Sequence, residues 1–76
     1  MSSGIRIVNM ELGKSRRQRA LFAAEVGNKE YRNLVIYEND GDVQVHYPMY
    51  VIDHMDPELR DRVSEKALNH YRSMTS

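Results

Sequence analysis

The chain of 76 residues contains no cysteine and only two prolines. Without cysteine it can form no disulfide, no thiolate zinc site and no cysteine nucleophile. No apolar run approaches the roughly 20 residues of a membrane-spanning helix. The opening residues MSSGIRIVNM lack the apolar core of a signal peptide. We therefore expect a cytoplasmic protein with a single domain over residues 1–76.

Signatures of catalysis and of cofactor binding are also missing. The four glycines are scattered, so they form no phosphate-binding loop. GKS at 13–15 resembles the end of such a loop, but the upstream glycine that the motif requires is replaced by Val8. The histidines His46, His54 and His70 match no metal-ligand spacing. We expect no enzymatic activity, no metal and no cofactor.

The C-terminal third has the pattern of an amphipathic helix. Asp56 suits the N-cap and Pro57 the first helical position. Apolar residues then recur every four positions, and two further ones widen the stripe: Leu59, Val63, Ala67 and Tyr71, then Leu68 and Met74. This pattern predicts a helix over about residues 57–73 that packs on one face of a sheet.

Two segments before this helix have the pattern of strands. Residues 33–47 read as a hairpin around Asp40 and Gly41, a pair that tolerates positive φ. Pro48 ends the second strand of this hairpin, and MYVI at 49–52 is compatible with renewed pairing at a sheet edge. Residues 4–12 read as a first strand, with one set of apolar side chains on each face: Val8, Met10 and Leu12 against Ile5 and Ile7.

Residues 16–26 fit two structures. Ser15 and Gln18 have the spacing of a helix capping box, and Gly27 suits the end of a helix. The same residues alternate as a strand would, and Gly27 with Asn28 is a two-residue hairpin signal. We favour the strand, because short hairpins then connect every segment. The fold class is α+β: a small antiparallel β-meander of three to four strands with one C-terminal helix, or, alternatively, a helix over residues 16–26.

Charge is balanced overall but unevenly distributed. Residues 1–36 carry seven basic and three acidic side chains, a net charge of +4, and residues 37–76 carry four basic and eight acidic ones, a net charge of −4. The stretch GKSRRQR at 13–19 holds four basic groups. Such asymmetry between the two halves suggests a charged partner. We expect this stretch to be an exposed turn, because burying an unpaired guanidinium is costly.

Two functional hypotheses follow. The first is a small non-catalytic regulatory or inhibitory module that binds another protein, of a size found among phage and mobile-element proteins. Tyrosine and methionine are enriched at recognition surfaces, and they cluster around Pro48, so the predicted partner-binding residues are Tyr47, Met49 and Tyr50. The protein could also pair with itself as a homodimer.

The alternative hypothesis is a nucleic-acid-binding protein that uses the basic turn at 14–19. Its predicted contact residues are Lys14, Arg16, Arg17, Arg19, Lys29 and Arg32. Cationic side chains neutralise phosphates, and Tyr31 could stack on a base. The neutral balance of the whole chain argues against this hypothesis.

Overall fold

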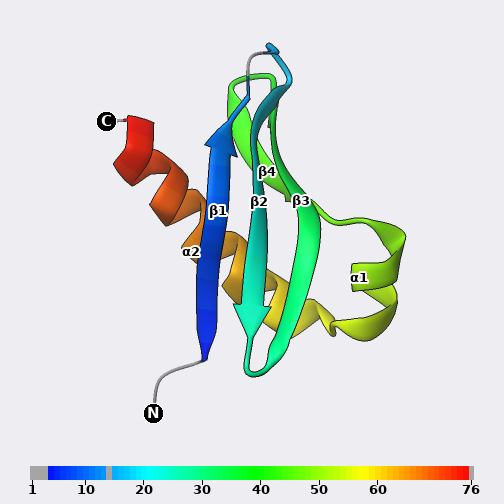
Figure 1. The fold of residues 1–76 in the computed structure, drawn as a ribbon. Helices are drawn as coiled ribbons and strands as arrows, with labels where there is room; N and C mark the ends of the chain where they lie inside the picture. The colour runs from blue at the N-terminus through cyan, green and yellow to red at the C-terminus, as the bar shows by residue number, and fades with distance from the viewer. Residues whose placement is uncertain (1–3, 14, 76) are drawn as a thin grey trace.

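In the computed structural model, which describes residues 4–13 and 15–75, an antiparallel sheet lies against one long helix (Figure 1). The described strands are β1 (Ile5–Leu12), β2 (Gln18–Val26), β3 (Lys29–Asn39) and β4 (Asp42–His46), and the helices are α1 (Met49–His54) and α2 (Pro57–Thr75). The strands lie in chain order in the sheet, each antiparallel to its neighbour. The predicted α+β meander with a C-terminal helix is confirmed.

Residues 18–26 form strand β2, so the alternative of a helix over 16–26 is wrong. The capping contact itself exists, since the Gln18 amide donates to Ser15 Oγ at 2.9 Å. It closes a turn instead of starting a helix, because the next residues pair with β1 and β3 on both sides. Gly27, with φ of 63°, then reverses the chain into β3. Sheet pairing thus overrides a local helix signal.

Strand β1 contains a bulge that corrects the predicted assignment of its faces. The register with β2 shifts between Val8 and Glu11, and Asn9 lies at φ of 55°. The bulge adds one residue to β1, so side chains that strict alternation would separate come to the same face. Ile5, Ile7 and Met10 consequently all pack on the core, whereas Val8 pairs with Ala23 on the other face.

Helix α2 covers the core face of the sheet. Val63, Ala67 and Tyr71 are its buried residues, as predicted, while Met74 is 43% exposed and does not widen the buried stripe. Asp56 is the N-cap, because its Oδ1 accepts the Leu59 amide at 2.8 Å. The largest fully buried side chains come from the sheet and both helices: Phe22, Leu34, Ile36, Val51 and Val63.

Residues 49–54 form helix α1, so the expected renewal of strand pairing at 49–52 is wrong. Pro48 is extended at the N-cap, and its carbonyl accepts the amides of Val51 and Ile52 at 3.0 and 3.2 Å. The turn places Val51 fully inside the core, with Met55 2% exposed behind it. Neither helix of the described residues is long and apolar enough to cross a membrane.

The packing of α2 predicts that Val63→Asp unfolds the protein. Val63 is 0% exposed, and an unpaired carboxylate there costs several kcal/mol, about the whole stability of a domain of this size. Asn69→Asp, which adds the same group at an exposed position of the same helix, should fold normally. Circular dichroism melting of both variants checks this. A cooperative, parent-like melt of Val63→Asp would contradict the packing.

Candidate functional site

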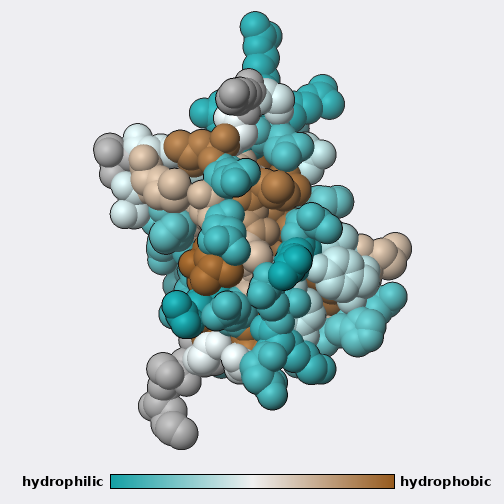
Figure 2. Space-filling model, viewed as in Figure 1, coloured by the Kyte–Doolittle hydropathy of each residue, from teal (hydrophilic) through white to brown (hydrophobic). Residues whose placement is uncertain are grey.

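One face of the sheet is not covered by α2, and we call it the open face. Core residues of each strand point toward α2, and the residues between them point away. The open face consists of Arg6, Val8, Glu11, Leu21, Ala23, Glu25, Glu30, Arg32, Val35, Tyr37, Gln44 and His46. Figure 2 views the molecule from this side and shows apolar surface among polar side chains over the strands.

The apolar residues of the open face are neighbours across the strands. Val8 pairs with Ala23, and Leu21 pairs with Val35. Leu21 is 36% exposed and Tyr37 is 39% exposed. The Tyr37 ring meets the ring of His46 edge-on, with centroids 5.7 Å apart. Leu21 and Tyr37 therefore present apolar surface to solvent beside the half-buried Val8 and Val35, whereas Ala23 is 5% exposed.

Most charges on the open face neutralise each other. Arg6 pairs with Glu25 at 3.6 Å, and Arg32 pairs with Glu30 at 2.7 Å. The hydrogen bond to Glu30 raises the pKa of Arg32 above its ordinary value. The two arginine side chains are about three-quarters exposed and the two glutamates about one-third, so these pairs contribute little to stability. Their effect is to leave this part of the surface without a strong field of either sign.

The open face also has a hollow where two bulges flank the middle of β2. Asn9 in β1 and Asn33 in β3 both lie in the left-handed region, at φ of 55° and 65°, on either side of Ala23. Asparagine is one of the few residues that tolerates this conformation. The hollow encloses about 380 Å³, and its lining comprises Asn9, Glu11, Leu21, Phe22, Ala23, Glu30, Arg32 and Asn33. We call it the double-bulge hollow.

The basic turn between β1 and β2 is exposed over Ser15–Gln18, as expected; Lys14 lies outside the described residues. The turn is tied to the sheet, because the Gly13 amide donates to the Arg19 carbonyl at 2.7 Å and the Glu38 amide donates to the Arg17 carbonyl at 2.8 Å. A Cβ at Gly13 would collide with the Gln18 carbonyl. These contacts fix Gly13 and Arg17 against their neighbours in the sheet.

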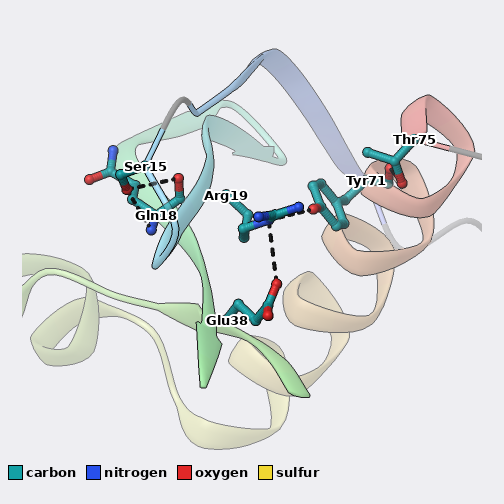
Figure 3. Close-up of polar contacts among 6 residues, drawn as sticks. All are labelled: Ser15, Gln18, Arg19, Glu38, Tyr71 and Thr75. Atoms are coloured by element: carbon teal, nitrogen blue, oxygen red, sulfur yellow. Dashed lines mark hydrogen bonds and ion pairs between the residues drawn. The ribbon is translucent and has the colours of Figure 1, made fainter. Parts of the chain in front are cut away.

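The Arg19 side chain contacts Tyr71 and Glu38 within the fold and is therefore not a free cation at the turn. Its Nε donates to Tyr71 Oη at 3.2 Å and lies 3.5 Å from a Glu38 carboxylate oxygen (Figure 3). The hydrogen bond to Tyr71, and then the Glu38 charge, raise the pKa of Arg19 above its ordinary value. Arg19 thus connects the start of β2 to α2 and β3.

The remaining predicted nucleic-acid contacts do not form one patch. Arg16 and Arg17 lie in the β1–β2 turn, and neither forms an ion pair with another described residue. Lys29 begins β3 at the opposite end of the sheet (Figure 1), and Arg32 is held by Glu30. Arg17 also lines a second hollow of about 330 Å³ together with Tyr37, Glu38, Asn39, Gln44, Val45 and His46.

The predicted partner-binding residues lie at the junction of β4 and α1. Met49 is 70% exposed and Tyr50 is 43% exposed, and Ile52, which the sequence did not single out, is 40% exposed. Tyr47 is half-buried, with its hydroxyl 2.7 Å from the Arg60 carbonyl and 2.5 Å from Ser64 Oγ. The hydroxyl of Tyr47 therefore connects the end of β4 to α2.

The Tyr50 hydroxyl braces the bulge of β3. It accepts the Arg32 amide at 2.6 Å and donates to the Arg32 carbonyl at 2.5 Å. Strand β4 pairs with β3 only over Val35–Asn39, so Arg32 lies on a part of the β3 edge that β4 does not cover. Tyr50 consequently supports the shape of the double-bulge hollow from α1.

The residues of the open face were missed because apolar residues occupy both faces of the strands. An excess of apolar residues in the strands could have indicated this face, because side chains that point away from the helix are apolar at Leu21, Val35 and Val8.

Within residues 4–13 and 15–75, no three histidine or carboxylate side chains lie close enough to hold a metal ion. No family model, no curated protein and no solved structure matches the chain.

Tyr50→Phe removes both contacts with Arg32 and should destabilise the protein. A net hydrogen bond contributes about 1 kcal/mol, and a domain of this size loses roughly 4–8 °C of Tm per kcal/mol. Tyr37→Phe is the matched control, since the Tyr37 hydroxyl has no hydrogen bond to another described residue. Equal Tm values for the two variants would contradict the bracing role.

Stability should fall at alkaline pH because of Tyr47. Burial raises the pKa of Tyr47 above its ordinary value of 10.0, and the hydrogen bond to Ser64 offsets part of that rise. The unfolded chain therefore loses this proton first as the pH rises, which favours unfolding. We expect the free energy of unfolding to decrease from about pH 10 upward. Urea titrations should show a shallower decrease for Tyr47→Phe, and an unchanged slope would rule out this cause.

Proposed function

We propose that this protein is a small non-catalytic regulatory or inhibitory module that binds another protein through the open face of its sheet. The observation that carries the proposal is the composition of that face: the exposed side chains of Leu21 and Tyr37, bordered by charges of which most pair with each other. An apolar centre with a polar rim is the usual anatomy of a protein–protein interface.

The charge pattern of the open face favours a protein over a nucleic acid. Nucleic-acid sites need cations that remain free to neutralise phosphates. On this face Arg6 and Arg32 are already paired with Glu25 and Glu30. Leu21 and Val35, by contrast, gain from removal of water at about 25 cal/mol per Å². The binding free energy would come chiefly from apolar contact.

Nucleic-acid binding is a second candidate, favoured by one observation. Arg17 lines one hollow together with Tyr37 and His46, and Arg16, in the same turn, likewise forms no ion pair with another described residue. Proteins that bind single-stranded nucleic acids combine cations that contact the phosphates with aromatic rings on which the bases stack. Asp40 in the β3–β4 turn and Asp42 at the start of β4, at the same end of the sheet, oppose this role.

A pull-down with matched variants tests the proposal. The full chain is immobilised and incubated with a lysate of cells of the organism that encodes it, with and without nuclease. Leu21→Thr changes the open face, and Ile52→Thr makes the same kind of change on α1, at 40% exposure against 36%. We expect a protein that survives nuclease to be retained by the parent and by Ile52→Thr, and lost with Leu21→Thr.

The other outcomes contradict the proposal in distinct ways. Loss with Ile52→Thr alone would place the binding surface at α1, next to Met49 and Tyr50. Capture of nucleic acid that requires Arg16 and Arg17 would support the second candidate. A variant is counted only when its circular dichroism melt resembles that of the parent.

A further inference from the structure

We propose that the double-bulge hollow receives an arginine side chain of the bound protein. This inference rests on the proposed function and specifies the chemistry of the partner. The hollow lies within the open face, between β1 and β3 and over the middle of β2, where Asn9 and Asn33 bulge on either side of Ala23. It is thus part of the surface that a protein bound to the sheet would cover.

The charged side chains that line the hollow have a net charge of −1, which one positive charge of a ligand would neutralise. Glu11 and Glu30 supply two carboxylates to its lining, and Arg32 supplies one guanidinium. Arg32 is held by Glu30 at 2.7 Å, whereas Glu11 forms no ion pair with any other described residue. Among the described residues, one negative charge in the lining is therefore uncompensated. If a partner covered the sheet without neutralising it, the buried charge would weaken binding.

The shape and composition of the hollow suit an arginine. Its lining includes Leu21, which is 36% exposed and can contact the aliphatic part of a long basic side chain. Its lining also includes Glu11 and Asn9, whose side-chain oxygens can accept hydrogen bonds. A planar guanidinium with five N–H donors can satisfy several acceptors at once, which an ammonium does with less directional control.

A small probe tests the hollow without the partner. N-acetylarginine amide is titrated into the labelled full-length protein, and backbone amide shifts are followed by NMR. N-acetylcitrulline amide is the neutral control of nearly equal shape. We expect saturable shifts at Asn9, Glu11, Ala23 and Asn33 with the arginine probe and much smaller ones with citrulline. Glu11→Gln should weaken binding about tenfold, because a charge-assisted hydrogen bond is lost.

Glu65→Gln is the matched variant, since it removes an exposed carboxylate from α2, away from the hollow. It should leave the affinity for the probe unchanged. Equal weakening by Glu65→Gln and Glu11→Gln, or equal binding of citrulline, would overturn the inference. Stronger binding of N-acetyllysine amide than of the arginine probe would also overturn it, in favour of a lysine.

A second copy of this chain is the competing occupant. Shifts at the same amides on raising the protein concentration, before any probe is added, would indicate self-association through the open face and would contradict the inference. The pull-down tests the proposed function and does not depend on whether the arginine probe binds. Loss of the partner on Leu21→Thr with no response to the arginine probe would retain the proposed function and reject only this inference.

Discussion

A single helix can cover only one face of a four-stranded sheet, and this constraint organises the molecule. Val63, Ala67 and Tyr71 place α2 on the core face, where fully burying an apolar side chain contributes about 1.5–3 kcal/mol. Residues 4–13 and 15–75 contain no further long element that lies on the other face. Apolar side chains on that face, such as Leu21 and Tyr37, therefore remain in contact with water unless a partner covers them.

Bulges on both sides of β2 adapt the strands to this one-sided arrangement. In β1 the bulge at Asn9 brings Met10 to the core face alongside Ile5. In β2 the register shift next to Ala20 lets Arg19 reach Tyr71 on the helix side. Bulges commonly re-aim side chains in this way. The bulges at Asn9 and Asn33 also line the double-bulge hollow, together with charged side chains.

The elements that could be predicted were those with strong local signals. The N-cap Asp56 and the four-residue apolar repeat were sufficient for α2, because both act within the helix itself. Whether residues 18–26 form a strand or a helix depended on their pairing with two neighbouring strands. The local sequence pattern carries no information about that pairing. For the same reason strict alternation misplaced Met10, since a bulge is set by the partner strand and by the conformation of Asn9.

The candidate site was harder to predict than the fold. The tyrosines near Pro48 were predicted to bind a partner from their type and clustering, but the contact of Tyr50 with Arg32 joins positions far apart in the chain. Arg19 counted as a free cation in the sequence, yet Glu38 and Tyr71 engage it in the fold. Whether a charge is free depends on tertiary contacts.

The accessibility of the open face is the central claim, and a soluble paramagnetic probe measures it directly. The Leu21 methyl groups should broaden strongly in NMR spectra when a neutral nitroxide is added to dilute protein. Those of Leu34, at 0% exposure, should stay sharp. Equal protection of the Leu21 and Leu34 methyl groups would show that the face is covered in the isolated protein and would contradict the account.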